Sequence, residues 1–217
     1  MRNILLAAVA ISALALPASA GQITQYAQNG LLNTLVATNP TASTTHLSVL
    51  DASVNIAALL NSPALPNAFF NFSADNAGAA VVLGGFIVGQ HFNGSFCLST
   101  LAGCGGTDLL SGTFTDAALG SVGGPGLVIN VNNPPDTLTL TSDIIPASLL
   151  IAPNTFDLSL SNIGAPGLSV ANGTITAFTA SYTGTLSASE VPEPTSLGLL
   201  GAGLLGLGFV ANRRRNV

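Results

Sequence analysis

The sequence predicts an all-β protein whose main part is an antiparallel, sandwich-like domain. Two stretches alternate polar and apolar residues strictly, 137–141 (Thr-Leu-Thr-Leu-Thr) and 157–161 (Asp-Leu-Ser-Leu-Ser). This period of two puts the leucines on one face of a strand and the polar residues on the other. Clusters of Gly, Pro and Asn at 123–126 and 132–136 separate such runs. Short strands joined by turns of this kind favour an antiparallel sandwich.

The composition is apolar and nearly free of charge. Hydrophobic residues make up 48% of the 217-residue chain, whereas charged residues make up 6%, against about 25% in ordinary soluble domains. No lysine is present, and the four arginines lie at the two ends. From Gly21 to Glu190 the side-chain charge is therefore 0 − 8 = −8, contributed by Asp51, Asp75, Asp108, Asp116, Asp136, Asp143, Asp157 and Glu190.

This charge distribution excludes two classes of partner for the central part of the chain. A nucleic-acid-binding surface needs Lys or Arg to neutralise phosphates, and residues 21–190 contain neither. Attraction to anionic lipid head groups is excluded for the same reason. We therefore expect no nucleic-acid partner.

The amino-terminal 20 residues have the layout of a secretory signal peptide. Arg2 supplies the positive charge, 4–16 is apolar, and Ala18 and Ala20 are the small residues of a cleavage site. A helix over 4–16 would reach only about 20 Å, which is short of a hydrocarbon core of about 30 Å. We expect cleavage after Ala20 rather than a transmembrane anchor.

The domain over 21–189 contains further strand signals. The run 174–186 is rich in Thr, Ile, Phe and Tyr, and its alternation slips near 177–178, which predicts a bulge or a bend. The apolar run 79–92 is split by Gly84 and Gly85, so either a buried bent strand or a tight hairpin would fit.

Two short segments of this domain have a helical pattern. Residues 28–37 and 57–60 could form short helices inside the otherwise β-rich region. Cys97 and Cys104 are the only cysteines, and an even number in an exported chain predicts a disulfide between them. The alternative is a metal site with His91, but the spacing lacks the paired Cys-x-x-Cys pattern of zinc sites.

The carboxyl-terminal segment 190–217 has three parts in a fixed order. They are the triplet Pro192, Glu193 and Pro194, the apolar run 195–210, and the basic cluster Arg213, Arg214 and Arg215. The apolar run would form a helix of about 24 Å, a marginal membrane span. The arginines are retained on the cytoplasmic side by the positive-inside rule, which puts 21–189 outside the inner membrane. The prolines predict an extended, protease-accessible backbone before the span.

On these three parts the tail resembles the PEP-CTERM sorting signal of Gram-negative bacteria. Proteins with this signal are understood as substrates of an exosortase, an integral-membrane cysteine transpeptidase, and are often encoded with exopolysaccharide and biofilm functions. The resemblance implies an exosortase as processing partner and a transient inner-membrane anchor. Delivery to the envelope, surface or matrix would follow, with exopolysaccharide as a further partner. The alternative is a plain anchor that is never cleaved.

The sequence contains no catalytic constellation. It has no Gly-x-Ser-x-Gly elbow, and a phosphate loop would need a lysine. His46 and His91 could each act as a general base beside a serine, but we interpret both as structural or surface residues. The segment 75–78 (Asp-Asn-Ala-Gly) is typical of a turn rather than of a calcium loop. We predict no catalytic residue, no metal site and no cofactor.

Two functions from different classes are compatible with these features. The first is a structural or adhesive surface protein that is not an enzyme. The second is a polysaccharide-binding sandwich module, although sugar-binding sandwiches usually stack rings on Trp or Tyr. The chain has no Trp, and its tyrosines are Tyr26 and Tyr182. A hydrolase is the least favoured reading.

Overall fold

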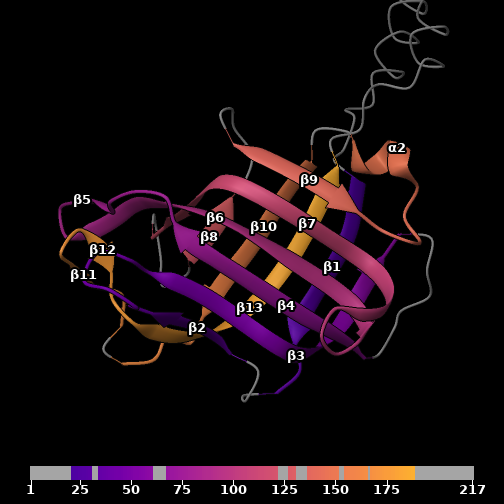
Figure 1. Ribbon diagram of the computed structural model, residues 1–217, viewed down its shortest axis with the longest axis horizontal. Coiled ribbons are helices and arrows are strands. Elements are labelled where there is room, and N and C mark those ends of the chain that lie inside the picture. Colours follow the sequence, from indigo (N-terminus) through magenta and orange to yellow (C-terminus); the bar gives the residue numbers. More distant parts are fainter. Residues whose placement is uncertain are drawn as a thin grey trace, which may run out of the picture. The chain divides into compact units, whose positions relative to one another are not determined.

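The computed structural model (Figure 1) describes residues 21–30, 34–60, 67–121, 127–130, 136–151, 154–165 and 167–188. The main sheet contains β1 (Gly21–Gln28), β2 (Leu35–Thr38), β3 (His46–Leu59), β4 (Ala68–Asn76), β5 (Val81–Leu83), β6 (Phe86–Leu101), β7 (Gly105–Gly120), β8 (Leu127–Asn130), β9 (Thr137–Thr141), β10 (Asn154–Ser161) and β13 (Phe178–Ala188). A small hairpin of β11 (Val170–Ala171) and β12 (Thr174–Ile175) and the short helix α2 (Ala147–Leu150) accompany it. The predicted all-β fold is confirmed.

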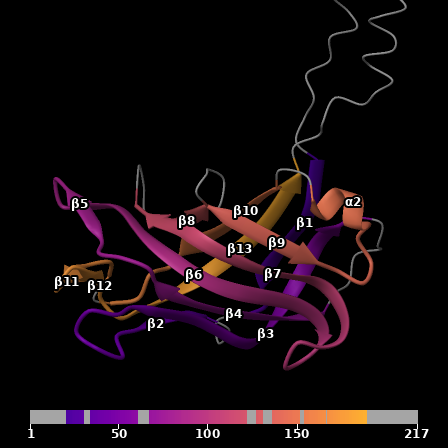
Figure 2. The ribbon, with the colours of Figure 1, turned by 45° about the horizontal axis from the view of Figure 1, so that its top comes forward.

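The main sheet returns on itself. Its hydrogen-bonded order is β5-β6-β4-β3-β1-β13-β10-β8-β7-β9, with β2 between β13 and β3, and β7 also pairs with β6. Every pairing is antiparallel. In Figures 1 and 2 the layer of β4, β6 and β7 lies in front of β1, β13 and β10. The predicted sandwich-like arrangement is thus one continuous sheet folded into two layers.

The sequence alternation produces the two faces of this sheet. In β10, Leu158 and Leu160 are buried and Ser159 is exposed, as the pattern predicts. In β9, Leu140 is buried while the three threonines face solvent. β13 repeats the pattern, with Phe, Ala, Tyr and Leu inward and Thr or Ser outward. Apolar side chains from both layers therefore fill the space between them.

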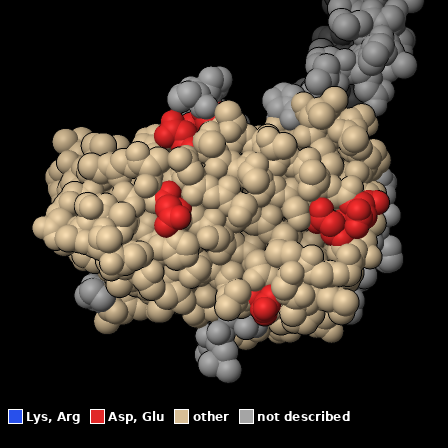
Figure 3. All heavy atoms as spheres, in the orientation of Figure 1, with Lys and Arg blue, Asp and Glu red and all other residues tan. Residues whose placement is uncertain are grey.

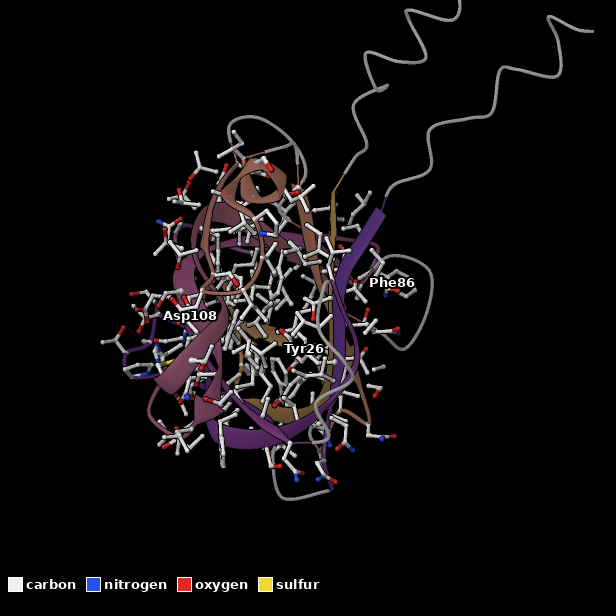
Figure 4. All side chains as sticks on the ribbon, turned by 90° about the vertical axis from the view of Figure 1, so that its right-hand side faces the viewer. Tyr26, Phe86 and Asp108 are labelled. Carbon is white, nitrogen blue, oxygen red and sulfur yellow. A yellow bond between two sulfur atoms is a disulfide. The ribbon has the colours of Figure 1, made fainter. Side chains whose placement is uncertain are left out.

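Aromatic rings occupy the centre of this core. The Phe70 ring centroid lies 4.8 Å from that of Tyr26 and 5.5 Å from that of Tyr182, and both tyrosines are only 1% exposed. Figure 4 shows Tyr26 among the side chains between the layers and Asp108 on the outside. Burial raises the pKa of both tyrosines, and the neighbouring Tyr182 raises that of Tyr26 further. Both hydroxyls are therefore neutral at physiological pH.

The first and last strands of the domain lie side by side. Gly21 pairs with Ala188, and the antiparallel register continues to Tyr26 opposite Gly184. Asn154 at the start of β10 also pairs with Ala188. The backbone therefore enters and leaves the sheet at the same end. The β5–β6 hairpin lies at the opposite end of the sheet (Figure 1).

Both predicted short helices are wrong for the described residues; positions 31–33 of the first lie outside the described ranges. Within 28–37, residues 35–37 belong to β2, and within 57–60, residues 57–59 belong to β3. Leu35 is buried and Val36 half-buried, which is the inside-outside alternation of a strand. Pairing with β13 and β3 overrides the local apolar pattern, because a short run cannot fix its own secondary structure.

The predicted glycine turn at 84–85 and the predicted break near 177–178 are both found in the structure. Gly84 and Gly85, with φ of +59° and +85°, form the tight turn of the β5–β6 hairpin, so the hairpin reading of this segment holds. The hairpin is exposed, whereas the bent-strand alternative required burial. The run 174–186 is divided at 176–177, between β12 and β13.

The predicted terminal signals are outside the described residues. The signal peptide at 1–20 and the apolar run 195–210 belong to the part that the structure leaves undescribed. Within the described ranges, no helix has the length and apolarity to cross a bilayer.

Gly184 is expected to be essential for packing, because a side chain at this position would overlap the Tyr26 ring. Gly184→Ala should lower the free energy of unfolding by about 1–3 kcal/mol, the usual cost of overpacking a core. Gly89→Ala is the matched control: it lies in β6 with nothing within 4 Å of its added Cβ. The control should change stability by less than about 0.5 kcal/mol. Equal denaturation midpoints for the two variants would contradict this packing.

Candidate functional site

A row of hydroxyl side chains crosses the outer face of one layer of the sheet. This layer, called the front layer below, comprises β3, β4, β6, β7 and β9. The register pairs one Ser or Thr on each of five adjacent strands, namely Ser48 on β3, Ser73 on β4, Ser95 on β6, Thr113 on β7 and Thr139 on β9. All five are exposed or half-buried. With neighbouring strands about 4.8 Å apart, the row spans roughly 19 Å. We call it the hydroxyl row.

The surface around the hydroxyl row carries acidic side chains and two histidines, but no Lys or Arg. Figure 3, which looks onto this layer, shows separate acidic clusters and no Lys or Arg. Further outward positions of the layer with hydrogen-bonding side chains include Asn71, Ser111 and Thr141. The face is therefore built for hydrogen bonding without strong electrostatic attraction to anions.

A groove of about 360 Å³ lies over one part of the hydroxyl row. Its lining comprises His46, Ser48, Val49, Leu50, Asn71, Phe72, Ser73, Ser95, Phe96, Cys97 and Cys104. Three residues of the hydroxyl row belong to it, and Asn71 adds an amide. Leu50 is 83% exposed and contributes an apolar edge.

Asp51 lies beside this groove and links β3 to Asn71 of β4 and to the β6–β7 turn. Its carboxylate accepts hydrogen bonds from the Gly103 N–H at 2.5 Å and from Asn71 Nδ2 at 2.9 Å, and its own N–H donates to Asn71 Oδ1 at 2.8 Å. Asp51 has φ +45° and lies where the register of β3 against β4 shifts. The Gly103 N–H and then the Asn71 amide hold the pKa of Asp51 below its usual value. The stability that the Asp51 carboxylate contributes to the fold is therefore fully present above its unfolded-state pKa. It is lost as the pH falls through its lower folded-state pKa.

The predicted disulfide is confirmed and forms part of the groove lining. Cys97 and Cys104 are bonded, with their Cα atoms 5.9 Å apart. Cys97 is an outward position of β6, and Cys104 belongs to the turn between β6 and β7. The bond folds this turn back over the sheet, next to Asp51. The alternative of a metal site with His91 is wrong, because both thiols are used in the bond.

Each histidine is held by a carboxylate. His46 Nδ1 lies 2.8 Å from Asp75 Oδ1, and His91 Nδ1 lies 2.8 Å from Asp116 Oδ1. Both pairs are on the outer face of the front layer. This is the orientation that a carboxylate gives to a general base in hydrolases, and also that of an ordinary surface hydrogen bond. The His46 pair flanks the groove, whereas His91 is not part of the groove lining.

The chemistry of the groove suits a neutral, polyhydroxylated ligand. Hydroxyls and an amide supply donors and acceptors, while Leu50 and the disulfide supply apolar contact. Ring stacking on tyrosine is unavailable, since Tyr26 and Tyr182 are both in the core. Any affinity for sugars must therefore come from hydrogen bonds and aliphatic contact.

The remaining sequence-predicted positions are structural or lie elsewhere. The segment 75–78 ends β4 in a turn, where Asn76 Oδ1 accepts from Thr45 N–H and Nδ2 donates to the Gly78 carbonyl. Among the described residues no cluster of three or more His, Cys, Asp or Glu occurs. The sorting and cleavage positions, which lie outside the described residues, are Ala18, Ala20, Pro192, Glu193, Pro194, Arg213, Arg214 and Arg215.

Sequence reasoning missed the groove, although one signal for it was present. In β3 the apolar positions run 47, 49 and then 52, 54, 56, so the alternation slips by one residue at Leu50–Asp51. Such a slip predicts a bulge that redirects a side chain. The partners of Asp51 come from β4 and from the β6–β7 turn, and these could not be assigned without the register.

Comparison with known proteins assigns the carboxyl-terminal segment. Residues 190–215 match the family described as the PEP-CTERM protein-sorting motif. No curated protein and no solved structure matches the chain. The resemblance inferred from the triplet, the apolar run and the arginines is thereby confirmed. The chain is an exported protein that an exosortase sorts.

Removal of the disulfide should weaken the fold. Cys97→Ser combined with Cys104→Ser should lower the free energy of unfolding by about 2–3 kcal/mol, because a short closed loop constrains the unfolded chain. Urea denaturation of the oxidised parent, the reduced parent and the double variant measures this. The reduced parent should match the variant, and an unchanged midpoint in both would refute the role given to the bond.

Proposed function

We propose that this exported protein is a non-catalytic structural or adhesive component of the cell surface or extracellular matrix. The observation that carries the proposal is the chemistry of the outer faces. In the front layer the hydroxyl row crosses five strands. In the back layer, β10 and β13 pair Thr155 with Ser187 and Ser159 with Thr183.

These faces suit a hydrated, polyhydroxylated surrounding. Ser, Thr and Asn side chains exchange hydrogen bonds with water and with sugar hydroxyls at similar energy, so they permit many weak contacts without a single strong site. The absence of Lys and Arg from 21–189 prevents collapse onto the acidic residues of neighbouring copies. A dense layer of such domains would remain soluble and open.

The sorting motif supports the same location. An exosortase substrate is processed at the inner membrane and delivered outward. This route suits a protein with a structural rather than a catalytic role at the surface. Transient anchoring through 195–210 and a matrix rich in exopolysaccharide are parts of this proposal.

A second candidate function is polysaccharide binding through the groove. The specific support is that Ser48, Ser73 and Ser95 form its floor beside Asn71, with Leu50 as an apolar edge. Neutral hexose units match this mixture of hydroxyls, an amide and an aliphatic side chain. Exopolysaccharide of the producing cell is the proposed ligand.

If the protein is structural or adhesive, its effect at the cell surface should not require the imidazole groups of His46 and His91. Cells lacking the protein should show reduced cell-to-cell adhesion or reduced matrix mass. Expression of the parent chain, or of the His46→Ala and His91→Ala double variant, should restore either property equally. Restoration by the parent but not by the double variant would favour catalysis at one of the His–Asp pairs. No difference between cells with and without the protein would remove the adhesive role.

The second candidate predicts binding that depends on the groove. The exported protein should be retained on immobilised exopolysaccharide from the producing cells, and Ser73→Phe should reduce retention about tenfold by filling the groove. Thr183→Phe is the matched control, since Thr183 is an exposed residue of the back layer. Equal retention of both variants, or no retention of the parent, would rule out the groove as a polysaccharide site.

A further inference from the structure

The β5–β6 hairpin exposes apolar side chains at the end of the domain. Its exposed residues, each 45–73% accessible to solvent, are Val81, Val82, Leu83, Phe86 and Val88. Three of them are consecutive, so both faces of β5 are apolar and uncovered. We call residues 81–88 the apolar tip. Such a concentration of exposed apolar groups marks an interaction surface.

β5 also has a free backbone edge. It is the last strand in the hydrogen-bonded order and pairs with β6 alone among the described strands. Natural edge strands are usually protected by Lys, Pro or an inward charge. β5 contains none of these. The short length of β5 and the register shift between Val81 and Val82 limit pairing with another extended strand to a few residues, and an edge of Val and Leu without a charge still permits it.

The charge distribution indicates which partner is compatible with this edge. No Asp, Glu, Lys or Arg occurs between Asp75 and His91, whereas the seven aspartates of residues 21–189 give the domain a side-chain charge of −7. A basic partner would bind the acidic faces instead of the apolar tip. Two copies of the domain repel one another wherever their acidic residues meet, and the apolar tip lets them touch without like charges in contact.

The position of the hairpin supports contact between copies. Gly21 and Ala188 lie at one end of the sheet and the apolar tip at the other (Figure 1). The sorting segment continues from the end that carries Ala188. The apolar tip therefore lies at the end of the sheet opposite Ala188, the last described residue before the tail.

We propose that β5 pairs antiparallel with β5 of a second copy about a two-fold axis at Val82. Val82 would then face the same residue of the second copy, and Val81 would face Leu83. Such an interface is isologous and closes after two copies. Three residues a side is far below the roughly 800 Å² per partner of a stable complex, so the association is weak and depends on high local concentration. The contact adds a homotypic partner to the proposed surface function.

A lipid surface is the competing occupant. Anionic head groups would be repelled by the domain, and the free N–H and C=O groups of β5 would be costly in hydrocarbon. Pairing with a second strand satisfies those groups, which is why a second copy fits the apolar tip better.

Cysteine cross-linking of the exported protein tests the proposed register. Across the axis, the Cα atoms of Val82 and its symmetry mate would be about 5 Å apart, within reach of a disulfide. Those of Leu83 and its mate would be about 8 Å apart, which is too far. Val82→Cys should therefore form at least tenfold more covalent dimer than Leu83→Cys, with the linkage mapped by mass spectrometry. Equal yields would overturn the register.

Sedimentation of the same protein tests the association itself. The parent should associate reversibly as its concentration approaches about 1 mM, and Val82→Asp should weaken this about tenfold because two carboxylates would face each other. Ser159→Asp adds the same charge on an exposed residue of β10 and should leave association unchanged. A parent that stays monomeric at 1 mM, or two variants that behave alike, would overturn the proposal.

A vesicle-binding experiment distinguishes a lipid surface from a second copy as the partner of the apolar tip. Flotation with phosphatidylcholine vesicles should leave the parent in solution. Binding that Val82→Asp abolishes would assign the apolar tip to lipid and refute the homotypic contact. None of these three measurements contains polysaccharide. A negative result for the homotypic contact would therefore leave the adhesive proposal and the groove proposal to be tested separately.

Discussion

The pairing of the first strand with the last is the constraint on which the remaining structure depends. β1 lies between β3 and β13, and Tyr26 of β1 packs over Gly184 of β13 beside Phe70. Without this pairing the sheet would open along most of β13, because only the short strand β2 would still link β13 to β3. Because residues 21–189 contain no Lys or Arg, backbone hydrogen bonds and apolar burial must supply most of the stability of this domain. The same pairing puts Gly21 and Ala188 together at one end, which leaves the opposite end and both outer faces available for contact.

The outer surface has two distinct features, the hydroxyl row and the groove, although the sequence contains few charged residues. Hydroxyls aligned by the register give a broad face of hydrogen-bonding groups, while one irregularity in β3 lies beside a defined groove. Asp51 holds that irregularity by accepting from Gly103 and Asn71, and the disulfide fixes the turn that carries Gly103. The groove thus depends on three segments that are distant in sequence. Its geometry follows from packing of the β6–β7 turn against β3, not from any local motif.

Local sequence patterns predicted the features that depend on neighbouring residues. Alternation placed Leu158 and Leu160 inside, Gly84 and Gly85 marked a turn, and the parity and spacing of Cys97 and Cys104 predicted their bond. The pattern failed at 28–37, where Leu35 belongs to a strand only because β13 and β3 lie beside it. The exposed face of the β5–β6 hairpin was missed for a related reason. A continuous apolar run reads as buried unless the sheet is known to leave it uncovered.

The sorting motif at 190–215 connects this domain to its place outside the cell. We propose that the mature protein consists essentially of the sheet domain, released from both terminal signals. Intact-mass spectrometry of the protein recovered from the envelope or medium tests this claim most directly, in cells with and without their exosortase. We expect a chain that begins at Gly21 and ends near Pro192–Pro194, lacking 195–217, only when the enzyme is present. Recovery of the full 217 residues, or an identical mass in both strains, would contradict it.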